Sequence, residues 1–164
     1  MPPMGMGLKA PRIAEHAGMT VAGLAQRYSP QTKGAIPALW QRFGPYIGRI
    51  PGQLGRDTYG VCARYEPEGS FQYLCGVQVE AGRSLPAGLT SVEIPRQTFA
   101  VFDHAGHISG ISATWKAIFA EWLPSSGCSL EVEPNFEAYR EAFDTQSGMG
   151  LVEIWIPLKA GTAA

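Results

Sequence analysis

The sequence contains few cysteines and no long apolar run. Its three cysteines, Cys62, Cys75 and Cys128, include no CxxC pair, so neither a zinc site nor a disulfide framework is indicated and we expect free thiols. No stretch approaches the ~20 apolar residues that span a bilayer. Residues 1–12 also lack the continuous apolar core of a secretory signal. We therefore expect a cytoplasmic protein with no membrane partner.

An excess of either charge is also missing. The chain has 13 Lys and Arg against 14 Asp and Glu, a net charge of −1, and its basic residues are scattered, so direct binding to nucleic acid is not expected. No P-loop, nucleophile elbow or GxGxxG fingerprint occurs. His104 and His107 lie close to Asp103 but offer too few ligands to indicate a metal. We therefore expect no cofactor.

What the chain does have is the composition of one globular domain. Its 164 residues are 45% hydrophobic and 16% charged, and 20 Gly and 13 Pro divide it into many short elements. This length allows one sizeable core. We expect an irregular segment at 1–18, a single domain at 19–158 and a loose tail at 159–164.

Apolar residues at helical spacing predict two helices, one from 36 that Gly44-Pro45 ends and one over 111–122 that Pro124 ends. Residues 66–70 carry turn chemistry between two aromatic-rich runs and predict a β-hairpin, in which a symmetric turn would place Cys62 opposite Cys75. The polar stretch 133–150, with Glu131, Glu133, Glu137, Glu141 and Asp144 in or beside it, is expected to be mainly a solvated loop with a short helix. Strands are expected at 20–28, 58–65, 71–80, 89–94, 98–104 and 152–158, with a further candidate at 128–132.

The two halves of the chain are similar to each other. IPALW from Ile36 and ISATW from Ile111 share the pattern Ile-x-Ala-x-Trp, 75 residues apart. The matching order of elements predicts a duplication with halves at 19–81 and 88–158. The expected fold class is α+β: two pseudo-two-fold-related strand-helix-strand-strand modules form an antiparallel sheet with two main helices and a central cleft. Such clefts often bind ligands.

The last predicted strand, VEIWIPL at 152–158, contains a carboxylate in an apolar run. Side-chain alternation places Glu153 and Trp155 on one face and the aliphatic residues on the other. Two interpretations are open: this face is solvated, or the pair lines a site. A partly buried carboxylate must be hydrogen-bonded, neutralised or matched by a cation. The second interpretation therefore predicts a pocket for flat, apolar, positively charged molecules.

Several stretches together resemble the GyrI-like effector-binding family. They are YGVCARYEPEGSFQYLCGVQVE (59–80), LPAGLTSVEIPRQTFAVFDHAG (85–106), ATWKAIFAEWLPSSG (113–127) and VEIWIP (152–157), with IPALWQRFG (36–44) matching the first helix of the family. The resemblance implies two strand-helix-strand-strand modules with a small-molecule pocket between them. Family members are effector domains of AraC-type and MerR-type regulators or stand alone. Only about 18 residues precede the domain, too few for a helix-turn-helix, so we expect a stand-alone protein.

The resemblance also implies site residues. The acidic residue of the family's last strand maps onto Glu153, and its hairpin aromatic maps onto Tyr73. Its helix aromatics map onto Trp40, Trp115 and Trp122. With the aromatic residues of the predicted elements included, the expected ligand-binding set is Glu153, Trp155, Trp40, Tyr65, Tyr73, Trp115 and Trp122.

Three functions are compatible with the sequence. The first is a protein that binds or sequesters amphipathic, aromatic, cationic small molecules. The second, implied by a subset of the family, is a hydrolase of cyclopropane-containing electrophiles with Glu153 as general acid or base. The third is a protein-interaction or inhibitor module, which predicts an exposed apolar patch. A homodimer is compatible with each.

Overall fold

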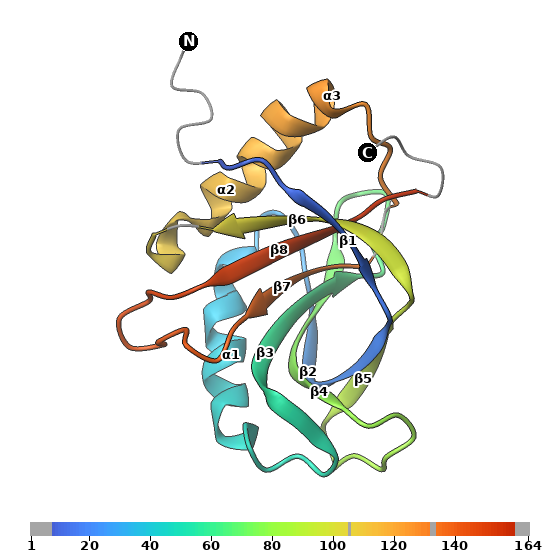
Figure 1. Ribbon diagram of the computed structural model, residues 1–164. Coiled ribbons are helices and arrows are strands. Elements are labelled where there is room, and N and C mark those ends of the chain that lie inside the picture. The colour runs from blue at the N-terminus through green and yellow to red at the C-terminus, as the bar shows by residue number, and fades with distance from the viewer. Residues whose placement is uncertain (1–7, 105, 132–133, 160–164) are drawn as a thin grey trace.

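The computed structural model describes residues 8–104, 106–131 and 134–159 (Figure 1). Its strands are β1 (Arg12–His16), β2 (Met19–Tyr28), β3 (Gln53–Ala63), β4 (Phe71–Val79), β5 (Thr90–Ile94), β6 (Gln97–His104), β7 (Asn135–Tyr139) and β8 (Val152–Pro157). Its α-helices are α1 (Ile36–Phe43), α2 (Ile111–Ala117) and α3 (Leu123–Ser126). All strand pairs are antiparallel within one sheet. The expected α+β class is confirmed.

The order of strands in the sheet is β1-β6-β8-β7-β3-β4-β2-β5. Exchanging each strand with the one four places away along the chain gives the same order reversed, which is the pseudo-two-fold arrangement that the repeat predicts. Each edge strand pairs with a strand of the other half of the chain: β1 pairs with β6, and β5 pairs with β2. Residues 12–16 belong to the segment 1–18 that was expected to be irregular. They form β1 because β6 supplies a pairing partner.

One face of the sheet, called here the helix face, is covered by α1 over β2 and β4 and by α2 over β6 and β8. Leu39 and Phe43 of α1 pack on the first pair of strands, and Ile118, which follows α2, packs on the second. The opposite face carries a third apolar cluster, to which every strand from β2 to β8 contributes at least one residue. The sheet is strongly curved around that cluster (Figure 1).

The second helical segment runs past the expected end at Pro124. A π-helical turn at Ile118–Trp122 follows α2, and Pro124 lies in the first turn of α3. Proline is tolerated there because the first turn of a helix needs no intrahelical N–H donor. The segment ends at Gly127, whose φ of 74° is in the left-handed region that glycine favours.

Three further expectations are corrected. In 133–150, Asn135–Tyr139 forms β7 and turns rather than a helix follow it. The described part of 128–132 contributes only a bridge from Leu130 to Leu158. Cys62 pairs with Tyr73 rather than with Cys75, because the hairpin turn is asymmetric and Arg64 takes a φ of 55°. None of the three cysteines forms a disulfide.

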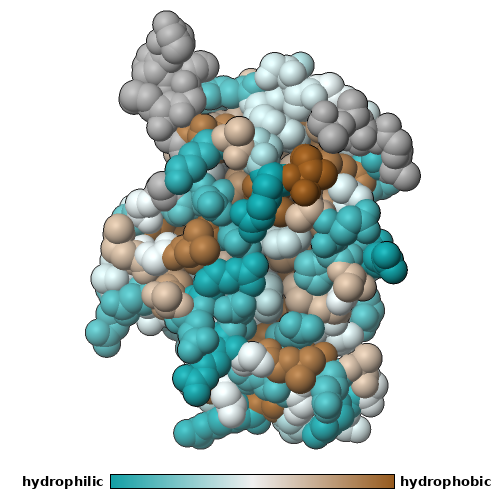
Figure 2. All heavy atoms as spheres, in the orientation of Figure 1, coloured by the Kyte–Doolittle hydropathy of each residue, from teal (hydrophilic) through white to brown (hydrophobic). Residues whose placement is uncertain are grey.

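The surface shows no single dominant apolar region on the side drawn in Figure 2. There, hydrophobic residues form separate small groups between polar ones. Among the described residues, no helix combines the length and the apolar composition needed to cross a membrane.

Candidate functional site

The central strands β3 and β7 carry the polar residues of the helix face. Residues paired across neighbouring strands point to the same face, and Glu137 pairs with Gly60 while Asn135 pairs with Cys62. These positions lie between the strands under α1 and those under α2. Side chains from both helices can therefore meet at the middle of β7.

Glu137 is the point where those side chains converge. The indole Nε1 of Trp115 donates to its Oε2 at 2.7 Å, and the hydroxyl of Tyr139 donates to its Oε1 at 2.8 Å. The hydroxyl of Tyr73 donates to the same Oε1 at 3.4 Å and accepts from Nε1 of Trp40 at 2.9 Å. We call Trp40, Tyr73, Trp115, Glu137 and Tyr139 the aromatic cluster. It joins α1, α2, β4 and β7 around one carboxylate.

Gly60 makes this arrangement sterically possible. Tyr73 is on β4 and Glu137 is on β7, so the phenol must cross β3, which lies between those strands. At Gly60 a β-carbon would overlap the phenol oxygen of Tyr73. Because Gly60 has no side chain, the phenol of Tyr73 can pass over β3 and reach the carboxylate of Glu137.

The charge of Glu137 has no partner cation among the described residues. The side chain is buried, with 9% of the residue exposed, and no Lys, Arg or His lies within ion-pair distance of it in the described part of the chain. Burial raises the pKa of Glu137 above its ordinary value, against the opposing effect of the hydrogen bonds from Trp115, Tyr139 and Tyr73. The charge of His104 also lowers the pKa, to a smaller extent. Among the described residues, the carboxylate is therefore hydrogen-bonded by neutral donors and has no cation in direct contact with it.

The neighbouring phenols and thiol stay protonated. Burial, followed by the negative charge of Glu137, raises the pKa of Tyr73 and of Tyr139 well above the ordinary value of a phenol. The same two causes raise the pKa of Cys62. Both phenols therefore act as hydrogen-bond donors, and Cys62 is not activated as a nucleophile.

The predicted site residues divide into two groups. Trp40, Tyr73 and Trp115 belong to the aromatic cluster, and Tyr65 lies beside it, where its hydroxyl accepts from Nδ2 of Asn135 at 3.2 Å. Trp122 instead packs edge-on against Phe102, with ring centroids 5.0 Å apart. The remaining two predicted residues, Glu153 and Trp155, lie on the opposite face of the sheet.

Glu153 is paired with cations of the chain itself. Arg12 Nη2 lies 2.8 Å from its Oε2, while Arg140 and the indole of Trp155 donate to its Oε1. Burial raises the pKa of Glu153, but the hydrogen bonds from Arg12, Trp155 and Arg140 outweigh burial and hold the pKa below its ordinary value. Glu153 is 5% exposed. The solvated interpretation is therefore wrong, and two arginines supply the compensating charge.

Trp155 belongs to the core. Its ring stacks on Phe136 with centroids 5.3 Å apart and planes 12° apart, and it is 8% exposed. Its indole N–H is used by Glu153. Both faces of β8 are thus buried. The alternation of its side chains therefore could not show whether Glu153 and Trp155 line a ligand site or belong to the core.

Both ring nitrogens of His104 contact groups of the chain itself. The ring nitrogens of His104 lie 2.8 Å from Oγ1 of Thr114 and 2.9 Å from the carbonyl oxygen of His107. Among the described residues, no three His, Cys, Asp or Glu side chains converge as metal ligands.

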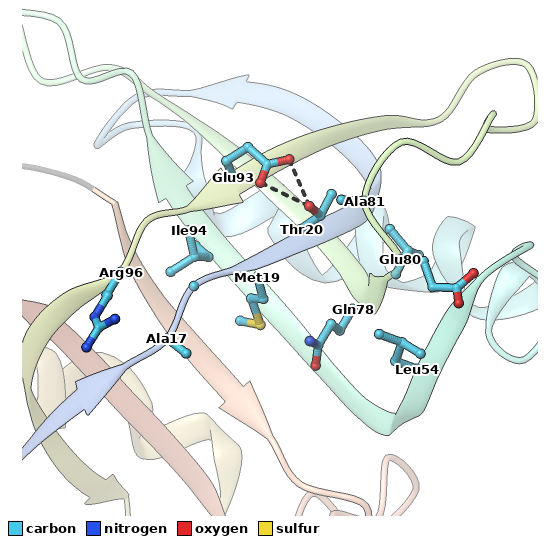
Figure 3. Close-up of a pocket in the computed structure, with 12 residues that line it drawn as sticks. Ala17, Met19, Thr20, Leu54, Gln78, Glu80, Ala81, Glu93, Ile94 and Arg96 are labelled. Carbon is cyan, nitrogen blue, oxygen red and sulfur yellow. Dashed lines mark hydrogen bonds between the residues drawn. The ribbon is translucent and has the colours of Figure 1, made fainter.

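A separate hollow of about 470 Å³ lies at the ends of β2, β4 and β5 (Figure 3). Its charged groups are not directed at a common point. Thr20 donates to Glu93 at 2.8 and 3.0 Å, and Glu80 pairs with Arg83 at 2.7 Å. No residue of the aromatic cluster lines this hollow. We therefore take the aromatic cluster as the candidate site.

Comparison with known proteins agrees with this fold. The model of the GyrI-like small molecule binding domain family matches residues 9–159. The transcriptional regulator BrlR of Pseudomonas aeruginosa is 31% identical over 152 residues, which are 90% of this chain and 54% of BrlR. The chain thus spans about half the length of that relative.

Two solved structures have the same fold. One is SAV2435 bound to tetraphenylphosphonium, with a TM-score of 0.73 and 19% identity over 93% of this chain and 95% of that one. The other is the integron cassette protein VCH_CASS2 from the mobile metagenome of Vibrio cholerae, with a TM-score of 0.71 and 19% identity over 93% and 97%. At these identities the likeness establishes the fold alone.

Proposed function

The chain belongs to the GyrI-like small molecule binding domain family, and we propose that its ligands are flat aromatic cations bound at the aromatic cluster. The observation that carries this proposal is the buried carboxylate of Glu137, held by three neutral donors and no cation among the described residues. A buried charge without a counter-charge is unfavourable. A cationic ligand would supply that counter-charge.

The rings around Glu137 suit such a ligand. Trp40, Trp115 and Tyr139 are each only partly buried, and a cation over such a ring gains about 0.5–2 kcal/mol. Tetraphenylphosphonium, the molecule bound to SAV2435, is itself an aromatic cation. We infer that Glu137 takes the charge-matching role that the sequence suggested for Glu153.

The proposed role of the domain is to capture or sequester such compounds rather than to bind nucleic acid itself. BrlR is a transcriptional regulator, and this chain matches only about half of it. Ligand binding by the described domain can therefore be measured separately from any regulatory activity.

The test is a fluorescence titration with a cationic acridine dye. Wild type is compared with Glu137→Gln and with Glu153→Gln, two carboxylate-to-amide changes on neighbouring strands. We expect Glu137→Gln to weaken binding about tenfold or more, because the amide cannot compensate a cation. We expect Glu153→Gln to change the affinity less than about threefold, once far-UV circular dichroism shows that the variant is folded. Equal affinity of wild type and Glu137→Gln would contradict the proposal.

A second function is favoured by the raised pKa of Glu137 and by the two phenols that contact it. A carboxyl group with a raised pKa can act as general acid or base. It could protonate an opening cyclopropane or activate a water that adds to it. Turnover of a cyclopropane-bearing alkylator, followed by product mass, should be lost in Glu137→Gln. Consumption limited to one equivalent per protein would reject catalysis.

A further inference from the structure

Asn135 is a second buried polar residue on the helix face of β7, and one of its atoms has no hydrogen-bond partner in the described part of the chain. The residue is 7% exposed, and its Nδ2 donates to the hydroxyl of Tyr65 at 3.2 Å. Its Oδ1 is buried and accepts no hydrogen bond among the described residues. Buried acceptors in native proteins almost always have a donor. This unpaired acceptor, beside the aromatic cluster, is a position at which a bound molecule would gain a hydrogen bond by bringing a donor.

The position of Asn135 relative to Glu137 restricts that ligand. The two residues are separated by one position on β7, so their side chains point to the same face about 7 Å apart. Both lie opposite β3, where Asn135 faces Cys62 and Glu137 faces Gly60. A flat molecule whose charge lies beside Glu137 can therefore present a substituent to Asn135 at the same time.

Building on the proposed function, we propose that the site selects aromatic cations that carry an N–H or O–H donor, and that Oδ1 of Asn135 accepts from this donor. A fully alkylated cation would compensate Glu137 but would leave Oδ1 unpaired and shielded from water. A cation with a ring amino group satisfies both acceptors. Sites built to hydrogen-bond a ligand discriminate against analogues without the donor, because the buried group then stays unpaired.

The test uses two dyes with the same cationic ring. Proflavine carries free ring amino groups, and acridine orange carries the same groups fully methylated, so only the first can donate from them. Both affinities are measured by fluorescence titration for wild type and for Asn135→Leu, which is similar in size but has no acceptor. We expect wild type to prefer proflavine about tenfold. In Asn135→Leu we expect the preference to fall to within about twofold.

The quantity that tests Asn135 is the change in dye preference between wild type and Asn135→Leu. The effect of the added methyl groups on affinity enters both preferences, so it cancels in that change. Asn135→Ala serves as a second variant if circular dichroism shows that Asn135→Leu is not folded. A preference unchanged by either variant, or tighter binding of acridine orange to wild type, would overturn the assignment.

The result also separates this inference from the proposed function. If Glu137→Gln weakens both dyes and wild type does not distinguish them, cation binding stands and the role of Asn135 is rejected. If neither dye binds to wild type, both are rejected.

Discussion

Glu137 and Glu153 lie on neighbouring strands and point to opposite faces of the sheet. In the β7–β8 pairing, Glu137 is opposite Ile154, and Ala138 is opposite Glu153. Both carboxylates are buried. Glu153 is held by Arg12 and Arg140, whereas Glu137 is held by two phenols and an indole. The charge of one carboxylate is therefore balanced within the fold, whereas the other has no cation in contact with it among the described residues.

Replacing each carboxylate by an amide should change stability in opposite directions. Glu153→Gln leaves two arginines without their buried partner, so we expect a loss of about 1–3 kcal/mol in the free energy of unfolding. Glu137→Gln removes an uncompensated buried charge, so we expect a gain of about 1 kcal/mol at neutral pH. Denaturant unfolding of both variants beside wild type measures the two changes. A large loss for Glu137→Gln would show that its charge stabilises the fold.

The pH dependence of stability should differ between the two groups. The folded-state pKa of Glu137 is raised, so its contribution is fully present below the ordinary pKa of a glutamate and is lost as pH rises through the raised value. The folded-state pKa of Glu153 is lowered, so its contribution is present above the ordinary pKa and is lost as pH falls through the lowered value. Unfolding curves from pH 3 to 8, compared between wild type and each amide variant, should show these opposite slopes.

Ligand binding should depend on pH through Glu137. A permanently charged aromatic cation such as tetraphenylphosphonium keeps its charge at every pH, so only the protein titrates. We expect its affinity to rise as pH increases through the raised pKa of Glu137 and then to level off. The bound cation should in turn lower that pKa. Calorimetric titrations at several pH values measure this, and a flat profile in wild type would exclude Glu137 as the titrating group.

Much of the fold follows from local patterns. The apolar residues at helical spacing in α1 and α2, together with the Ile-x-Ala-x-Trp repeat, predicted the order of elements and the pseudo-two-fold arrangement. β7 was missed because its buried positions, Phe136 and Ala138, alternate with Asn135, Glu137 and Tyr139 in a strand of only five residues. A short strand with a polar residue at every second position resembles a solvated loop in sequence. The alternation of NFEAY was the signal that could have identified it.

Part of the aromatic cluster was predicted from the sequence. Trp40, Tyr73 and Trp115 were named in advance, and the structure brings all three together. The sequence could not tell which glutamate they surround, because Arg12 and Arg140 are 141 and 13 positions away from Glu153 in the chain. Such ion pairs depend on sheet pairing, which local patterns do not determine. Glu153, the carboxylate expected to bind a ligand, is paired with two arginines on one face of the sheet. Glu137, on the other face, has no cation within ion-pair distance among the described residues.

The indole hydrogen bond to Glu137 can be removed while the ring is kept. Trp115→Phe deletes the donor that lies 2.7 Å from Oε2, whereas Trp40→Phe deletes a donor that reaches the carboxylate only through Tyr73. A hydrogen bond to a carboxylate lowers its pKa by about one unit. We therefore expect Trp115→Phe to move the pH midpoint of cation binding upward by about one unit, and Trp40→Phe to move it less. Equal midpoints in both variants would show that the direct bond has no special effect.

Gly60 tests whether the phenol of Tyr73 belongs to the site. A β-carbon at position 60 would overlap that phenol, so Gly60→Ala should force Tyr73 away from Glu137 while leaving β3 paired. Tyr73→Phe is the matched control, because it removes the hydroxyl and keeps the ring in place. If the hydroxyl matters only as a donor to Glu137, both variants should raise the pH midpoint of dye binding to the same extent. The alternative is that the position of the Tyr73 ring also shapes the site. In that case, at a pH where Glu137 is ionised in both variants, Gly60→Ala should weaken dye binding several-fold more than Tyr73→Phe. Wild-type affinity and midpoint in Gly60→Ala would show that Tyr73 lies outside the ligand's contacts.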